Sequence, residues 1–124
     1  MHELSIAIGI IEAVTEERCL RQGTMQAVQA VHLRLGPLSG VDRSALEFAY
    51  QVAREQTRLA RADLVIEETP VTFHCPACNC TRSPVSIQCL VCSVCGMPAT
   101  EITGGNELEI VALEIIENEP ASAC

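Results

Sequence analysis

The residues best suited to chemistry are cysteines paired at a two-residue spacing. Cys75 and Cys78 form one C-x2-C pair, Cys92 and Cys95 form a second, and thirteen residues separate the pairs. A tight turn directs both sulfurs of a pair at one ion, and the longer loop brings the second pair opposite, as in a zinc ribbon. Because four thiolates leave no open coordination position, we expect a structural Zn²⁺ on these residues, the four ribbon cysteines.

Other chemistry of these sulfurs stays open. The same thiolates suit a rubredoxin-like iron site, and a disulfide is a further alternative. Cys80 and Cys89 lie in the same stretch and offer alternative ligands, and His74 could replace a cysteine, since the two residue types interchange in zinc sites. These neighbours leave the ligand assignment open without weakening the prediction that the stretch binds a metal.

A second group that could bind a metal stands at the start of the sequence, in Met1, His2 and Glu3, the N-terminal triad. If the α-amine of Met1 is free, that amine, the His2 amide nitrogen and the His2 imidazole close adjacent chelate rings on one ion. This nitrogen-rich set suits Ni²⁺ or Cu²⁺ better than harder cations. On chemistry alone an exposed histidine, and a glutamate favoured by the helix macrodipole, explain the same residues.

The elements that would position these groups follow from hydrophobic periodicity. Apolar residues at three- and four-residue spacing from Leu4 to Val14 predict an amphipathic helix that ends near Gln22, with Gly23 as its C-cap. Cys19 is then a helix residue. A free start of this helix would carry the N-terminal triad.

A strand is predicted over residues 30–35, because apolar and polar residues alternate there. Its buried face carries Val31, Leu33 and Leu35, and His32 faces solvent. This assignment makes His32 a surface residue rather than a ligand.

A second helix is predicted to begin near Asp42 or Ser44, where residues 44–47 have the form of a capping box. Its buried stripe consists of Ala45, Leu46, Ala49, Val52 and Ala53. A strand over residues 63–68 follows, and the strand–helix–strand order suggests a right-handed crossover.

Further strands are predicted over residues 101–103 and 108–116, separated by a turn at residues 104–106. Glu114 falls on the same face as the apolar residues of the last strand, and a bulge or strand end near Ala112 would resolve this conflict.

These elements predict an α+β fold, with two helices packed on a small three-stranded mixed sheet and an inserted four-cysteine zinc ribbon. Residues 1–72 and 99–118 would form the α/β domain, residues 73–98 the ribbon, and residues 119–124 a flexible tail. In that tail we expect Cys124 to be a free thiol.

Composition limits the functions open to the chain. Its 124 residues suffice for one domain with an insertion, and the net charge of −8 with 2% aromatic residues argues against binding to nucleic acid. No apolar run is long enough to span a membrane, and no secretory signal is evident. We therefore expect a cytoplasmic protein that contacts neither nucleic acid nor membrane.

Several segments together resemble the HypA/HybF family of hydrogenase nickel metallochaperones. These are MHELS at residues 1–5, VHLRLG at residues 31–36, the cysteine ribbon, and GNEL at residues 105–108. The resemblance covers nearly the whole chain. The ribbon by itself is generic, whereas MHE joined to it is specific.

The resemblance implies that Met1, His2 and Glu3 hold a transient Ni²⁺ while the four ribbon cysteines hold a structural Zn²⁺, with Asp42 as a weak accessory candidate. It implies delivery of Ni²⁺ to the [NiFe]-hydrogenase large-subunit precursor together with a HypB-type nickel GTPase, and no catalysis. Val111 and its apolar neighbours fit either a homodimer interface or a second covered sheet face.

Two rival functions remain. A zinc-ribbon adaptor in protein assembly or transcription needs only the ribbon, and a residue added before Met1 would not harm it. A thiol redox protein would use Cys78, Cys80 and Cys89, but reactive thiols need nearby cations, and the stretch offers only Arg82.

Overall fold

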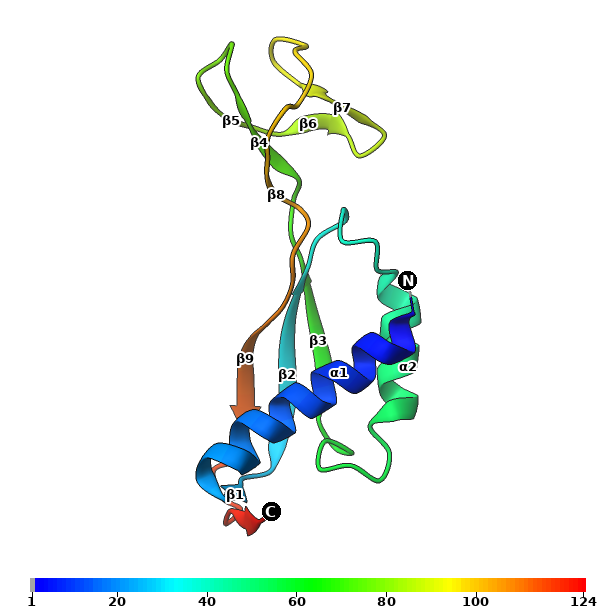
Figure 1. Cartoon of the computed structure of the whole chain (residues 1–124), viewed down its shortest axis with the longest axis vertical. Helices are drawn as coiled ribbons and strands as arrows, with labels where there is room; N and C mark the ends of the chain where they lie inside the picture. Colours follow the sequence, from blue (N-terminus) through cyan, green and yellow to red (C-terminus); the bar gives the residue numbers. More distant parts are fainter. Residues whose placement is uncertain (1) are drawn as a thin grey trace. The chain divides into compact units, whose positions relative to one another are not determined.

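A computed structural model describes residues 2–124 of the chain (Figure 1). The chain divides into two compact units. The first holds the chain as far as Leu33, together with Asp42–Ile66 and Ile110–Cys124, and the second holds Arg34–Val41 and Glu67–Glu109. Among the described residues, no helix has the length and apolarity needed to cross a membrane.

Two helices and most of a three-stranded sheet build the first unit. Helix α1 covers Glu3–Thr15 and α2 covers Arg43–Ala53, and the sheet has the order β3 (Asp63–Glu68), β2 (Val28–Leu35), β9 (Leu108–Ile115). In Figure 1 α1 runs obliquely across β2 and β3, and α2 packs beside it. These elements confirm the predicted α+β class.

The core of the first unit is aliphatic, and α1 contributes its buried residues at helical spacing, namely Ala7, Ile10, Ile11 and Val14. Strand β2 buries Val31, Leu33 and Leu35, as its alternation predicted.

Helix α2 buries Leu46, Ala49 and Tyr50. The predicted stripe was wrong at Val52, which is 53% exposed. Tyr50 enters the core instead, because its hydroxyl donates a hydrogen bond of 2.9 Å to the Ala62 carbonyl, which satisfies the one polar atom of the ring.

The end of the first helix agrees with its predicted cap. After α1 the chain continues through a π-helical turn, η1 (Glu16–Leu20). Gly23 then takes a positive φ of 70° and donates its N–H to the Cys19 carbonyl at 2.8 Å. The short strand β1 (Thr24–Met25) follows.

The start of α2 differs in detail from the prediction. Asp42 is the N-cap, and its Oδ1 accepts from the Ala45 N–H at 2.9 Å and from the Ser44 hydroxyl at 2.8 Å. The predicted capping box does not form, because Glu47 pairs with Arg43 at 3.0 Å. The charged carboxylate of Asp42 is the stronger acceptor and takes the capping position.

The conflict at Glu114 has a simple resolution. β9 runs continuously from Leu108 to Ile115, and the Glu114 carboxylate lies 2.9 Å from Nε2 of His32 on β2. Glu114 is therefore paired with His32, the histidine that the sequence predicts to face solvent.

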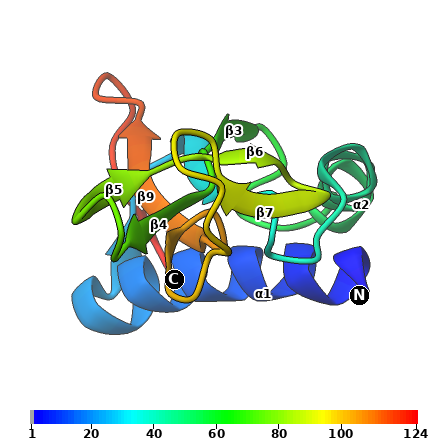
Figure 2. The ribbon, with the colours of Figure 1, turned by 90° about the horizontal axis from the view of Figure 1, so that it is seen from above.

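The second unit consists of short antiparallel strands, visible as two hairpins in Figure 2. One sheet has the order β5 (Cys80–Arg82), β4 (Thr72–Cys75), β8 (Ile102–Gly104). The second hairpin pairs β6 (Pro84–Ser86) with β7 (Cys89–Cys92).

Backbone hydrogen bonds join residues 36–38 of this unit to residues 105–107. The N–H of Gly36 donates to the Glu107 carbonyl at 2.8 Å, and the N–H of Leu38 donates to the Gly105 carbonyl at 2.7 Å. The Glu107 carboxylate accepts from the Thr69 hydroxyl at 2.7 Å and from the Gly105 N–H at 2.8 Å. These bonds, with the Thr69 hydroxyl first, hold the pKa of Glu107 below its usual value.

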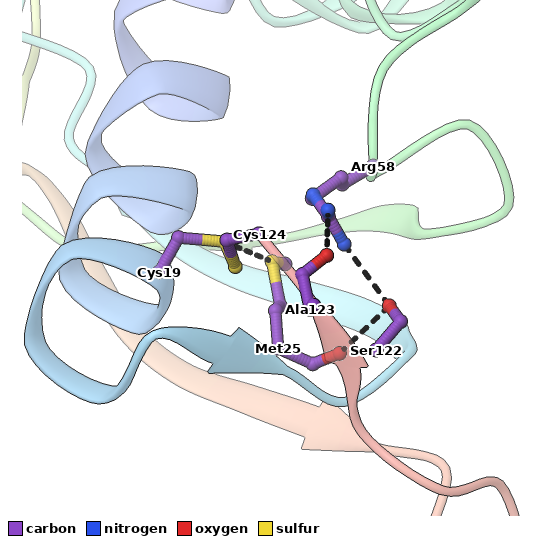
Figure 3. The surroundings of a disulfide bond; sticks show 6 residues. All are labelled: Cys19, Met25, Arg58, Ser122, Ala123 and Cys124. Carbon is purple, nitrogen blue, oxygen red and sulfur yellow. Dashed lines mark hydrogen bonds between the residues drawn. A yellow bond between two sulfur atoms is a disulfide. The ribbon is translucent and has the colours of Figure 1, made fainter.

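The C-terminal residues are structured. Strand β10 (Ser122–Ala123) pairs antiparallel with β1, and Cys124 forms a disulfide with Cys19 (Figure 3). The expectation of a free thiol at Cys124 was therefore wrong. The two cysteines are 105 residues apart, and no local pattern in the sequence relates them.

Candidate metal centres

Two turns present the four ribbon cysteines. Cys75 ends β4 and Cys92 ends β7, so each strand delivers the first sulfur of a pair. After Cys92 the chain reverses, with the Gly96 N–H donating to the Cys92 carbonyl at 2.9 Å and Gly96 at a φ of 76°. Asn79 takes a φ of 54° after the first pair. Asparagine and glycine tolerate this left-handed backbone, which lets the chain turn back beside the sulfurs.

The four sulfurs converge. All ligand atoms of the four ribbon cysteines lie within 4.8 Å of one another, with 3.4 Å between Cys75 and Cys95 and 3.9 Å between Cys78 and Cys92. Zn–S bonds of about 2.3 Å in a tetrahedron place sulfurs about 3.8 Å apart. The donor set therefore fits one tetrahedral Zn²⁺. Within residues 2–124 these cysteines are the one such group of three or more His, Cys, Asp or Glu ligands.

The site is half enclosed. Cys75 and Cys92 are 0% and 1% exposed and pack with the fully buried Phe73, whereas Cys95 is exposed. The buried pair anchors the cluster in the small core of the unit, Cys78 packs partly buried against that core, and Cys95 is exposed to solvent.

The pKa values of Cys92 and Cys95 are shifted in opposite directions. The backbone N–H groups of Cys95 and Val94 point at Cys92 Sγ at 3.5 and 3.4 Å, and they lower the pKa of Cys92 to about 6 despite its burial. At Cys95 the Met97 N–H lowers the pKa, but hydrogen bonding to Cys75 and burial outweigh it and raise the pKa to about 12. The lowered pKa favours the thiolate form of Cys92, whereas a metal that binds Cys95 must displace its proton.

The neighbouring candidates lie outside this cluster. Cys80 stands opposite Cys75 in the β4–β5 register, and Cys89 is exposed at the start of β7. His74 alternates with Cys75 along β4, so its side chain leaves from the other face of the strand.

Arg82 is a feature that the sequence reasoning undervalued. It is the only Asp, Glu, Lys or Arg between residues 69 and 100. Its Nε is buried and has no hydrogen-bond partner among the described residues. A hydrogen bond with Cys78 and the charge of Cys80 raise the pKa of Arg82. The sequence signal for this residue was its isolation, a single charge in a stretch that binds a metal through anionic sulfurs.

The N-terminal triad is described in part, because Met1 lies outside the described residues. His2 is exposed at the N-cap position of α1, and Glu3 begins the first turn. Glu3 Oε2 accepts from the Asp42 N–H at 3.4 Å, so Asp42, the accessory candidate, lies beside the triad. The Asp42 carboxylate itself caps α2, and the Ala45 N–H and Ser44 hydroxyl hold its pKa below the usual value.

Comparison with known proteins gives one consistent result. The family model described as "Hydrogenase/urease nickel incorporation, metallochaperone, hypA" matches residues 1–115. A hydrogenase maturation factor HypA from Chloroflexus aggregans is 45% identical over 114 residues, covering 92% of this chain and 98% of that protein. One from a Roseiflexus species is 42% identical over 120 residues, covering 97% and 96%.

Solved structures agree with these matches. The solution structure of the Ni metallochaperone HypA from Helicobacter pylori aligns with a TM-score of 0.63 at 28% identity and covers 94% of this chain and 98% of that one. A second solution structure of a HypA protein aligns with a TM-score of 0.65 at the same identity.

Proposed function

The chain belongs to the HypA family of hydrogenase/urease nickel-incorporation metallochaperones, and on that premise we propose that it delivers Ni²⁺ for maturation of a [NiFe]-hydrogenase large subunit. The family match over residues 1–115 is the observation that carries this proposal. Metallochaperone work is binding and transfer of an ion, so the role includes no catalytic step.

Nickel would bind at the N-terminal triad. The proposed donors are the α-amine of Met1, the amide and imidazole nitrogens of His2, and the Glu3 carboxylate. The first N–H groups of a helix have no intrahelical acceptor, so binding at the His2 amide costs α1 no hydrogen bond. The partial positive charge of the helix N-terminus opposes a cation, and Glu3 offsets it. An ion held in this way can also be released.

Zinc would be the resident metal, held by the four ribbon cysteines. Bound there, Zn²⁺ supplies folding free energy. The chain's own contribution is to hold Cys75 and Cys92 buried beside Phe73 and to direct backbone N–H groups at Cys92 Sγ. On this proposal residues 73–98 serve zinc, and residues 1–72 with 99–118 serve nickel.

The proposed partners are a HypB-type nickel GTPase and the large-subunit precursor of a [NiFe]-hydrogenase, in the cytoplasm. A net charge of −8 repels nucleic acid and anionic membranes, so neither is included. A homodimer is the second assembly to test, through the exposed Ile110 and Val111 of β9.

The test is metal content and Ni²⁺ titration by calorimetry on tag-free protein with a native Met1, beside His2→Ala. His32→Ala is the matched control, because His32 is a half-buried histidine paired with Glu114 in the same unit. We expect one tightly held zinc in all three proteins and one exchangeable nickel in the wild type and the control only.

A second variant with one glycine added before Met1 tests the role of the α-amine. It should lose nickel binding and keep zinc, because the extension moves the amine away from His2. Equal nickel binding in the wild type and His2→Ala would overturn the terminal site and favour a zinc-ribbon adaptor.

A further inference from the structure

The residues after Ile115 lie beyond the part of the chain that the family model matches. They nevertheless form specific contacts with the rest of the first unit (Figure 3). In the β1–β10 pair, Thr24 lies opposite Ala123 and Met25 lies opposite Ser122. The segment is therefore structured, although the family model does not extend over it.

Polar contacts from two directions hold this segment. The Cys124 N–H donates to the Gly23 carbonyl at 3.1 Å, and the Ser122 hydroxyl donates to the Met25 carbonyl at 3.4 Å. Arg58, from the loop after α2, donates to the Ser122 hydroxyl at 3.0 Å and to the Ala123 carbonyl. All of these groups belong to the first unit.

The noncovalent part of this attachment is short. β1 and β10 contain two residues each, and residues 122–124 are exposed. An isolated two-stranded ribbon is marginal in water, and ordering a chain segment costs conformational entropy. The Cys19–Cys124 bond, which joins positions 105 residues apart, therefore adds a covalent link to a segment whose noncovalent contacts are few.

The two sulfurs differ in access. Cys19 is 9% exposed and its Sγ lies 3.9 Å from Sδ of Met25, whereas Cys124 is exposed. Thiol–disulfide exchange requires the attacking thiolate to reach one sulfur and the other to leave. Attack is open at Cys124, so Cys19 is the leaving sulfur.

We propose that the Cys19–Cys124 disulfide is a redox-sensitive clasp, opened by a low-molecular-weight thiol of the glutathione class, whose reduction releases β10 from β1. The thiolate attacks Cys124 Sγ, forming a mixed disulfide while the bond to Cys19 breaks. The electron pair leaves with Cys19 Sγ, which takes a proton. A second thiolate attacks the sulfur of the low-molecular-weight thiol in this mixed disulfide, its bond to Cys124 Sγ breaks, and Cys124 Sγ leaves with the electron pair and takes a proton. Two thiols are oxidised to one disulfide, and the protein gains two electrons and two protons.

Opening the clasp changes a neighbouring groove. Cys19 and Arg58 help to line a groove of about 590 Å³ between the end of α1 and the loop after α2, together with Ile11, Leu20 and Thr57. In the clasped state Arg58 is bound to the tail. In the opened state Cys19 becomes a thiol and Arg58 loses its tail acceptors, so the redox state sets the chemistry of this groove whether or not the chain binds nickel.

The test uses the full, zinc-loaded chain equilibrated in buffers of fixed reduced-to-oxidised glutathione ratio, then acid-quenched, alkylated and peptide-mapped. We expect Cys19 and Cys124 to become alkylatable together in one two-electron transition. A trapped glutathione adduct should sit on Cys124. Backbone order parameters of residues 122–124 should fall from about 0.8 to below about 0.6 on reduction, with α1 unchanged.

Matched variants separate the clasp from general thiol effects. Cys124→Ser should show the mobile tail without any reductant, and Cys89→Ser, which removes an exposed cysteine elsewhere, should keep the transition of the wild type. An ordered tail in reduced protein, an adduct on Cys19, or a Cys19–Cys124 bond that survives excess reduced glutathione would each overturn the proposal.

Discussion

At the scale of single residues, Arg82 shows how one charge acts on a metal site. Four thiolates on one Zn²⁺ carry a formal net charge of −2, and Arg82 is the only charged side chain from residue 69 to residue 100. Its buried Nε has no partner in the described chain, which leaves it available to a thiolate sulfur. Groups beyond the first ligands commonly change metal affinity by about 10–100-fold.

We therefore predict that Arg82→Gln speeds zinc transfer to a chromogenic chelator by about 10-fold, because the thiolates lose their counter-charge. The matched control is Arg61→Gln, which removes an exposed arginine from the first unit. Cobalt-substituted protein should also show a shifted sulfur-to-metal charge-transfer band in Arg82→Gln alone. Equal transfer rates in the two variants would contradict this role.

Substitution by alanine should change stability in opposite directions at Gly36 and Gly9. A Cβ at Gly36 would lie 2.1 Å from the Gly105 carbonyl oxygen, whereas a Cβ at Gly9 meets nothing within 4 Å. Gly36→Ala must push two hydrogen-bonded backbones apart, and overpacking of this kind costs about 1–3 kcal/mol or more. Gly9→Ala should stabilise α1 by about 0.5–1 kcal/mol, because alanine is the better helix former. Thermal melts by circular dichroism should therefore shift in opposite directions.

At the scale of elements, the start of α2 links helix capping to pH. The Ala45 N–H and the Ser44 hydroxyl hold the pKa of Asp42 below its usual value. A carboxyl whose pKa is depressed by folding stabilises the protein above its unfolded pKa, and this contribution is lost as pH falls through the folded pKa. The capping contribution should therefore be present at neutral pH and fade below about pH 4.

The matched variants are Asp42→Asn, which keeps a capping oxygen but does not titrate, and Asp42→Ala, which removes the cap. Tyr50 is the only tyrosine, tryptophan is absent, and Tyr50 is buried in the first unit, so its fluorescence reports urea unfolding of that unit. Between pH 7 and pH 3 the wild type should lose more stability than Asp42→Asn. Asp42→Ala should be least stable at pH 7. Identical pH slopes in the wild type and Asp42→Asn would refute the assignment.

Features of helices and strands that depend on residues close in sequence were predictable, and those that depend on distant residues were not. The alternation in residues 30–35 and the Gly23 cap depend on neighbours in the chain, and both were predicted. The choice of Tyr50 over Val52 for the core was not, since it depends on the Ala62 carbonyl, an acceptor outside the helix. The sequence left Asp42 and Ser44 open as the start of α2, because both side chains can cap a helix, and the structure has Asp42 as the N-cap.

At the scale of the whole molecule, distance along the chain separates what was predicted from what was not. The four ribbon cysteines act through two local turns, and their spacing alone predicted that they converge. The Cys19–Cys124 bond joins residues 105 apart, and only the fold brings them together. The expectation of free thiols came from the rarity of disulfides in cytoplasmic proteins. It says nothing about which cysteines the fold brings close together.

Because the chain divides into two units, we predict that removal of the metal unfolds only the second unit. The second unit has a small buried cluster of Phe73, Cys75 and Cys92, whereas the first unit has a separate aliphatic core around Tyr50. A small module whose core includes metal ligands depends on the metal for its folding free energy. Chelation of zinc should therefore abolish amide exchange protection in β4, β5, β6 and β7 while Tyr50 fluorescence stays native.

Cysteine variants make this prediction specific. Cys92→Ser removes a buried ribbon cysteine and should reproduce the chelated state, whereas Cys89→Ser removes an exposed cysteine outside the cluster and should not. If chelation also unfolds the first unit, the Tyr50 signal changes with the loss of zinc, and the two units fold as one. If protection in β4 and β7 survives chelation, the hairpins are stable without metal, and zinc is bound rather than structural.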